Sequence, residues 1–406
     1  MTTLMSLIGI IVLLTFAFAL SAYRRRINWR TVSVAFLLQF IIGAFALYLP
    51  IGKAVLAKMS AGVTNVLSYG QTGIEFMFGE IGQFKLGFVF AFHVLPVVIF
   101  FSSLVAVLYY LGIMGRVIRI FGGALQALLG TSRAESMSAT ANIFVSQTEA
   151  PLVVKPFIAN MTKSELFAVM VGGMATVAGS TLAGYVALGV EMKYLLAASF
   201  MAAPGGFLMA KMLMPETEAV NDSDAVLKEE HDQYVNVIDA AAGGAADGLQ
   251  LAVNIGAMLI AFVALIAMTN GFLGWAGAVM GVPDLSLQMI LGQAFRSVAF
   301  ILGVPWSESA IAGSLIGQKL VLNEFVAFLD FAAQKEFLSA HTQAVVTFAL
   351  CGFANFSSIA ILLGGLATIA PSRRQDVAEM GMRAVAAAFL ANLMSAAIAG
   401  FFLSLA

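Results

Sequence analysis

The chain has 406 residues, of which 61% are hydrophobic and only 11% are charged, and its formal net charge is -1 at pH 7. Soluble domains carry roughly 25% charged residues, so this composition excludes a soluble globular protein and indicates a polytopic membrane protein. The balanced charge and the lack of a long basic run argue against a nucleic-acid partner. A single cysteine, Cys351, excludes an intrachain disulfide framework.

The first 114 residues predict three membrane spans. Residues 4–22 are uncharged and are followed by Arg24, Arg25, Arg26 and Arg30. A signal peptide carries its charge before the apolar run, so we expect a retained span with its N-terminus outside and these arginines in the cytoplasm. Residues 31–48 then return outward and residues 86–114 cross inward. Between them, residues 51–84 are too polar to span and predict one or two interfacial helices.

The next segment predicts a re-entrant hairpin. Residues 136–158 are apolar but broken at Gln147–Pro151, and each arm has about 10 residues where a span needs about 20. We therefore expect the hairpin to enter from the cytoplasm and turn back. Residues 165–190 then cross outward with an unwinding signal at Val177–Thr181, and residues 194–214 return.

The second half of the chain repeats this order in the opposite orientation. After a polar cytoplasmic stretch, the predicted elements are a span over 249–280, a hairpin over 306–338 broken around 320–324, a span over 344–369 interrupted at 352–358, and a last span over 377–405 that leaves the C-terminus outside. Hairpin, broken span and span thus occur twice and enter from opposite sides, which is the inverted repeat of secondary transporters.

These elements predict an all-α polytopic membrane protein with eight transmembrane helices, two re-entrant hairpins and interfacial helices. We expect a scaffold made of residues 1–135 and 249–280. Residues 136–214 and 281–406, which contain the repeat, would form a transport part, and residues 215–248 a cytoplasmic polar loop.

The polar residues of the first hairpin predict a ligand site. Gln147 offers a donor and an acceptor, Thr148 a rotatable hydroxyl and Glu149 a carboxylate, which together match the edge of a nucleobase or an amide. The alternative is that they cap the two half-helices. Because a cap does not need a carboxylate at membrane depth, the pattern favours the ligand.

A second polar group surrounds the other breaks. Glu324 can accept two hydrogen bonds at once, which suits the vicinal hydroxyls of a sugar; the alternative is a salt bridge to Lys319, at a spacing that is poor for one helical face. Asn355 and Ser358 either satisfy backbone groups at the break or bind a ligand, and Phe353 either packs or stacks on a base.

Asn142 and Thr176 supply oxygen donors beside unwound carbonyls, a pattern that by itself indicates a small-cation site only weakly. The sequence offers no arrangement of a nucleophile with a base, so an intramembrane hydrolase is disfavoured. A passive channel would not need two hairpins that open from opposite sides. The residues therefore favour a carrier.

Four stretches resemble the motifs of the concentrative nucleoside transporter family, in its sodium-coupled bacterial form. In chain order they are Asn142–Leu152 (NIFVSQTEAPL), Val177–Tyr185 (VAGSTLAGY), Leu322–Phe325 (LNEF) and Gly352–Ile359 (GFANFSSI). The resemblance covers residues 30–405. Three positions depart from the family pattern: Ser146 replaces a usual glycine, Thr176 a more usual serine, and Thr181 a small apolar residue.

The resemblance implies a homotrimer in a lipid bilayer, each protomer having a scaffold and a mobile transport part. It implies that Gln147, Thr148 and Glu149 bind the base, lined by Phe353 and Thr181, and that Glu324, Asn355 and Ser358 hold the ribose. Sodium would bind between hairpin and broken span, at Asn142, Val145, Thr176 and Val177, the valines through their carbonyls.

We therefore expect a symporter in the inner membrane that imports uridine-like nucleosides with sodium, by elevator-type alternating access. It would be no enzyme and would use no cofactor beyond the coupling ion. The alternative is proton coupling, with Glu149 or Glu324 as the proton carrier.

Overall fold

The computed structural model describes residues 2–83, 89–219, 234–282 and 284–405, and within these ranges the regular structure is helical throughout, without a strand. This confirms the predicted all-α class. Of the loop predicted at 215–248, residues 220–233 lie outside the described residues, as does the start of the predicted span at 86–114. Residues 237–248 are helical and begin the long helix Val237–Met280.

Seven segments of the described chain are long and apolar enough to cross a membrane. They are α1 (Thr2–Ala19), α2 (Trp29–Leu47), α4 with α5 (Phe90–His93, Leu95–Tyr110), α9 with α10 (Lys163–Ala175, Gly179–Ala187), α11 (Met192–Leu213), α12 (Val237–Met280) and α18 (Arg374–Leu403). The other predicted span corresponds to α16 (Ala340–Leu350) and α17 (Ser357–Ile369), each too short to span alone. A total of eight spans therefore stays a prediction.

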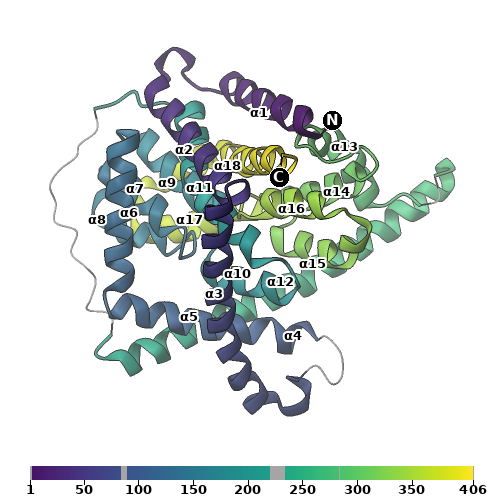
Figure 1. The fold of residues 1–406 in the computed structure, drawn as a ribbon, viewed down its shortest axis with the longest axis horizontal. Coiled ribbons are helices and arrows are strands. Elements are labelled where there is room, and N and C mark those ends of the chain that lie inside the picture. Colours follow the sequence, from purple (N-terminus) through teal and green to yellow (C-terminus); the bar gives the residue numbers. More distant parts are fainter. Residues whose placement is uncertain (1, 84–88, 220–233, 283, 406) are drawn as a thin grey trace.

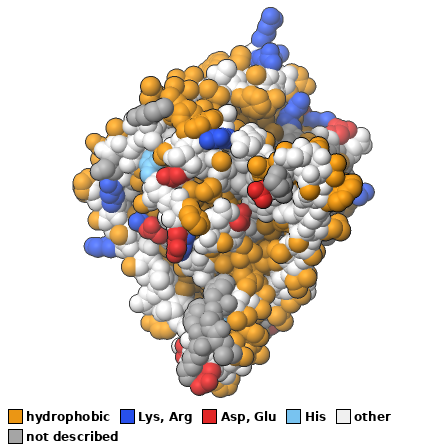
Figure 2. Space-filling model, turned by 90° about the vertical axis from the view of Figure 1, so that its right-hand side faces the viewer, with side chains coloured by type: hydrophobic (Ala, Val, Ile, Leu, Met, Phe, Trp, Pro, Cys, Tyr) orange, Lys and Arg blue, Asp and Glu red, His pale blue; other side chains and the backbone are white. Residues whose placement is uncertain are grey.

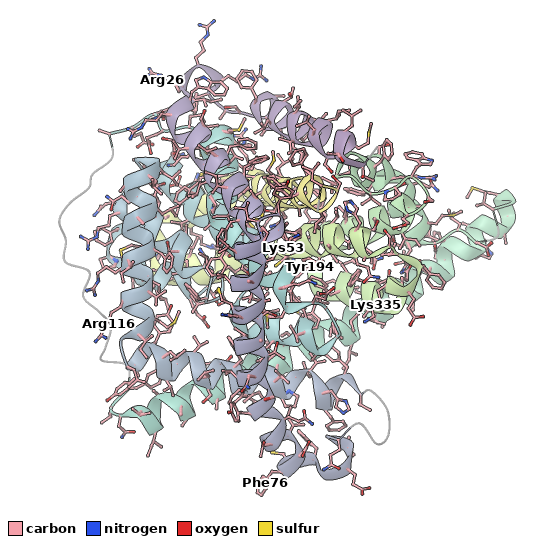
Figure 3. The ribbon with its side chains drawn as sticks, viewed as in Figure 1. Arg26, Lys53, Phe76, Arg116, Tyr194 and Lys335 are labelled. Atoms are coloured by element: carbon pink, nitrogen blue, oxygen red, sulfur yellow. The ribbon has the colours of Figure 1, made fainter. Side chains whose placement is uncertain are left out.

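Two helices run across the direction shared by α5 and α18, as Figure 1 shows for α3 and α6. The first, α3 (Pro50–Phe78), occupies the segment that predicts interfacial helices. The second, α6 (Ile113–Leu129), was not predicted: Gly112, at φ 69°, ends α5, so the prediction of one helix continuing to Met114 is wrong. Residues 114, 118, 122, 125 and 129 of α6 are buried at helical spacing. Arg116 projects away from the body (Figure 3).

Each half of the repeat starts with such an amphipathic helix. α6 precedes the first hairpin, which consists of α7 (Arg133–Ala141), a non-helical tip, η3 (Ala150–Val154) and α8 (Lys155–Ile158). α13 (Leu287–Ile301), equally missed from the sequence, precedes the second hairpin of α14 (Ser309–Val321) and α15 (Glu324–Gln334). In both halves an amphipathic helix thus precedes the residues 136–214 and 306–405 that the sequence predicts as the inverted repeat, and the inversion itself stays a prediction.

The repeat forms the interior of the molecule. The most apolar windows of α9–α10 and α11 are 94% and 89% buried, whereas those of α1 and α12 are only 28% and 17% buried. α18 lies in the centre and packs against α9, α11 and α16 (Figure 1). Exposed hydrophobic side chains cover much of the face in Figure 2, as expected where lipid is the solvent.

The two chain ends lie on one side of the molecule, where Ser404 Oγ donates to Thr3 Oγ1 at 2.7 Å. Both termini therefore face the same side. Which side that is stays a prediction.

A buried ion pair fixes the first hairpin to α11. Lys211 Nζ lies 2.7 Å from Glu135 Oε2, and both side chains are more than nine-tenths buried. Glu135 also forms a capping box with Ser132 at the start of α7. Such a pair is costly to break because the remaining charge stays buried and uncompensated.

We predict that Lys211→Met lowers the unfolding free energy by roughly 3–5 kcal/mol, because Glu135 loses its counter-charge. The measurement is the thermal midpoint of the detergent-solubilised protein. Lys163→Met is the control: its ion pair with Asp376, at 3.3 Å, is on the surface, with the lysine side chain 56% exposed. That variant should change the unfolding free energy by less than about 1 kcal/mol. Equal midpoints for the Lys211 variant and the wild type would contradict the structural role of the buried pair.

Candidate functional site

The four breaks in the repeat are joined by backbone hydrogen bonds. Gly179 N, at the start of α10, donates to Phe144 O in the first hairpin at 3.1 Å. Phe356 N, at the start of α17, donates to Leu320 O in the second hairpin at 3.2 Å. Each hairpin thus binds the broken helix of its own repeat in the same sense. The freed backbone groups satisfy one another, as membrane depth requires.

Glu324 lies in a buried hydrogen-bonded cluster at the tip of the second hairpin. Its carboxylate accepts from Asn355 Nδ2 at 3.0 Å and from Tyr185 OH at 3.2 Å, and the residue is only 5% exposed. Asn323 caps α15 beside it by accepting from Val326 N. A carboxylate has more acceptor sites than these two donors occupy, so it can accept further hydrogen bonds from a ligand.

Asn355 and Ser358 fix the backbone of the break between α16 and α17. Asn355 Oδ1 accepts from Ser358 N at 2.9 Å and from Ser357 Oγ at 2.6 Å, and Ser358 Oγ donates to Phe353 O. Both residues therefore satisfy backbone groups at the break, which is one of the two alternatives that the sequence left open. This role coexists with the Asn355–Glu324 contact and holds the loop that carries the half-buried Phe353.

The tip of the first hairpin folds back on itself. Glu149 accepts from Ser146 N at 3.1 Å, and Thr148 Oγ1 lies 3.0 Å from Ser146 Oγ. Gln147 packs on α9, where a Cβ on Gly173 would lie 3.0 Å from Gln147 Cβ. Glu149, which is exposed, therefore caps a backbone N–H of the tip, as the alternative to ligand binding predicts.

Buried oxygen atoms without a partner remain at this tip. Among the described residues, no hydrogen-bond donor reaches Asn142 Oδ1 or Gln147 Oε1, although the two side chains are 0% and 5% exposed. Such atoms are costly at membrane depth, so they point to a ligand. Thr176 lies at the end of α9, where its Oγ1 donates to Gly172 O, and a Cβ on Gly172 would be 3.5 Å from Asn142 Nδ2. Val177 is buried there too.

The contacts of the described residues do not join every predicted site residue. Val145 and Thr181 are buried, but their backbone nitrogens donate within their own segments, to Ala141 O and Ala178 O. Nothing described connects Gln147, Thr148 or Glu149 directly with Glu324. Whether both tips close around one solute therefore stays a prediction.

Sequence reasoning missed the roles of Tyr185 and Asn392 in this region, and it placed Lys319 only as an alternative partner of Glu324. Tyr185 contacts Glu324, and Asn392 of α18 lies between the breaks. Lys319 does not pair with Glu324, as the alternative reading proposed; it donates to Ala349 O at 2.7 Å and to Asn392 Oδ1 at 2.6 Å. The available signal was their isolation as polar groups in apolar helices.

Models of one protein family match nearly the whole chain. The model for the Na+ dependent nucleoside transporter C-terminus matches residues 194–400, that for its N-terminus matches residues 8–81, and a nucleoside recognition (Gate) model matches residues 91–192.

Known proteins resemble the chain over its length. An uncharacterized transporter of Haemophilus influenzae is 54% identical over 100% of this chain and 99% of its own. The nucleoside permease NupC of Helicobacter pylori is 48% identical over 100% of this chain and 99% of its own. Sodium/nucleoside cotransporter 1 of Mus musculus is 40% identical over 98% of this chain and 63% of its own.

Solved structures agree with the fold. CNTnw in an inward-facing substrate-bound state is 56% identical, with a TM-score of 0.96, and covers 100% of this chain and 99% of that one. A variant of CNTnw in an outward-facing state gives 55% identity and a TM-score of 0.97 over 100% of both chains.

The Glu324 cluster generates a prediction. Glu324→Gln should raise the Kd for a bound nucleoside roughly 10- to 100-fold, because hydrogen bonds to a charged acceptor contribute about 1.5–3 kcal/mol. Tyr185→Phe removes one donor to this carboxylate and should raise the Kd about 2- to 10-fold. Isothermal titration of the purified protein with uridine measures both.

Tyr194→Phe is the control, since the ring of Tyr194 on α11, labelled in Figure 3, packs against Phe348, whereas Tyr185 and Asn355 donate to Glu324. An unchanged Kd in the Glu324 variant would remove this cluster from the binding site.

Proposed function

The chain belongs to the Na+ dependent nucleoside transporter family, and from that membership we propose that it is a symporter that imports nucleosides together with sodium. It is a multi-pass membrane transporter and not an enzyme. The proposal rests on two kinds of buried polar group at the hairpin tips. The second hairpin carries a carboxylate with spare acceptor sites, and the first carries amide oxygens that have no partner among the described residues.

We assign the ribose to the second hairpin. Glu324 offers acceptor sites for two vicinal hydroxyls, and Asn355 and Tyr185 hold the carboxylate in place. Ser358 orients the loop through Asn355 and Phe353. A sugar without these hydroxyls would leave the carboxylate short of donors in a buried site.

We assign the base to the first hairpin. Gln147 Oε1, which has no partner among the residues that the structure describes, can accept from a base N–H, and Thr148 and Glu149 lie beside it at the same tip. Phe353 and Thr181 would line the base from the two broken helices. Uridine is the proposed representative substrate, because its base edge combines donor and acceptor groups as Gln147 does.

The sodium site would use neutral oxygens only. Asn142 Oδ1, which lacks a partner among the described residues, fits a cation, and Thr176 and the carbonyls of Val145 and Val177 would complete the set. Hard monovalent cations bind such oxygen sets at unwound helix segments. Sodium is here a co-transported substrate.

Proton coupling is the rival, because Glu324 is a buried carboxylate and the nearby Lys319 binds elsewhere. Glu324 or Glu149 would then carry the proton. The two mechanisms differ in the gradient that drives accumulation.

For the transport step we propose an elevator. The repeat would carry the site past a scaffold of α1, α2, α3, α4, α5 and α12, with α10 sliding on α5, on which it packs through Gly179 and Phe101. The protein would form a homotrimer in the inner membrane. The Arg24–Arg26 turn would then lie on the cytoplasmic side, and both termini would lie outside the cytoplasm.

The sodium site generates a prediction. Asn142→Ala should raise the sodium concentration for half-maximal uridine uptake about tenfold or more, since it removes one charge–dipole ligand. Proteoliposomes with sodium and proton gradients imposed separately give the measurement. Full accumulation under a proton gradient in sodium-free buffer would reverse the assignment.

The ribose assignment predicts the order of competitors. Uracil and 2′,3′-dideoxyuridine should compete for uridine uptake roughly 10- to 100-fold less well than uridine, because both lack the hydroxyls that Glu324 would bind. Competition assays in the same vesicles test this. The assignment is wrong if uracil displaces uridine as effectively as unlabelled uridine does.

A further inference from the structure

Lys319 is a fully buried lysine that donates to the last turn of α16 and to Asn392 of α18. It is 0% exposed and donates to Ala349 O at 2.7 Å and to Asn392 Oδ1 at 2.6 Å. Ala349 lies in the last turn of α16, where the helix dipole is negative, so the ammonium is compensated without a carboxylate. A buried charge of this kind is retained only where its geometry is fully satisfied.

Asn392 hydrogen-bonds to the backbone at two helix breaks at once. Its Nδ2 donates to Ala175 O at 2.7 Å and to Cys351 O at 3.0 Å, and these residues end α9 and cap α16. An ammonium can only donate, so it selects the amide oxygen. The amide nitrogen must therefore face the two carbonyls, which fixes the orientation of the Asn392 side chain.

The contact between the two breaks is close. A Cβ on Gly352 would lie 2.3 Å from Asn392 Oδ1 and 2.7 Å from Ala175 O, so only glycine fits there. The next residue, Phe353, donates its N–H to Thr176 O at 3.2 Å. Lys319, Asn392 and Gly352, with the carbonyls that they meet, form what we call the junction.

The junction lies between the two proposed sites. Ala175 immediately precedes Thr176 and Val177, which would bind sodium, and Gly352 immediately precedes Phe353, which would line the base. A sodium ion bound at the break after α9 would therefore be connected to the break after α16 through Asn392 and through the Thr176–Phe353 hydrogen bond.

We propose that Lys319 and Asn392 are positioning residues that couple sodium binding to nucleoside binding. This inference rests on the proposed sodium symport. Neither residue touches the solute or the ion in the proposal; each acts by holding the two breaks in register.

The test is the coupling factor, the ratio of the uridine Kd without and with saturating sodium, measured by titration calorimetry on the purified full-length protein. Coupling of binding sites is commonly about 5- to 150-fold. We expect a factor in this range for the wild type and a fall to less than about twofold in Asn392→Ala and in Lys319→Gln. Lys319→Gln keeps a hydrogen-bond donor but shortens the side chain and removes its ammonium group.

Ser395→Ala is the matched control. Ser395 is buried on the same helix one turn away but accepts from Gln39 Nε2, outside the junction, so its coupling factor should equal that of the wild type. A full coupling factor in either junction variant would overturn the inference and leave sodium symport standing. No sodium effect in the wild type would overturn both.

Loss of the fold in both junction variants, beside a folded Ser395→Ala protein, would also contradict the inference. The junction would then be a general stabilising contact rather than a coupling element.

Discussion

The structure depends on one constraint: backbone groups freed by a helix break inside a membrane must find partners within the protein or in a ligand. In this chain, backbone groups at the breaks hydrogen-bond to one another. The hairpins bind their own broken helices through Phe144–Gly179 and Leu320–Phe356, and the two broken helices meet through Thr176 and Phe353. Side chains such as Asn355 and Asn392 hydrogen-bond to further backbone groups at the breaks. Asn142 Oδ1 and Gln147 Oε1 in the first hairpin, which find no donor among the described residues, are then natural positions for an ion and a solute.

Buried charged side chains also have partners within the protein. Glu135 and Lys211 neutralise each other, Lys319 binds carbonyl and amide oxygens, and Glu324 accepts from a phenol and an amide. Of these, Glu324 alone is held only by neutral donors, so it keeps capacity for hydroxyl groups of a ligand. The proposed sodium oxygens carry no formal charge, and a bound cation would therefore bring the charge with it. A site of this type releases its ion without leaving a buried carboxylate unpaired.

The order of spans and hairpins follows from the sequence because hydropathy, positive charge and arm length are local properties. Gln147 and Glu324 could be singled out for the same reason: each is polar in an apolar segment. α6 and α13 were missed because an amphipathic helix lacks the continuous apolar run that marks a span. Tyr185, Lys319 and Asn392 could not be placed, since their partners lie 139, 30 and 217 residues away along the chain. Contacts at such separations depend on tertiary packing, which periodicity does not encode.

In the proposed elevator the repeat moves as a block past the scaffold, and a cross-link between the two parts would prevent this movement. A Cβ on Gly184 of α10 would lie 3.3 Å from Val94 Cγ1, and one on Gly256 of α12 would lie 3.3 Å from Leu95 Cδ1. In a Cys351→Ser background, a short thiol cross-linker joining Val94→Cys to Gly184→Cys ties repeat to scaffold. Joining Leu95→Cys to Gly256→Cys ties scaffold to scaffold. We expect the first cross-link to abolish uridine uptake but preserve uridine binding, and the second to leave uptake intact. Undiminished uptake by protein fully cross-linked between residues 94 and 184 would contradict the proposed elevator.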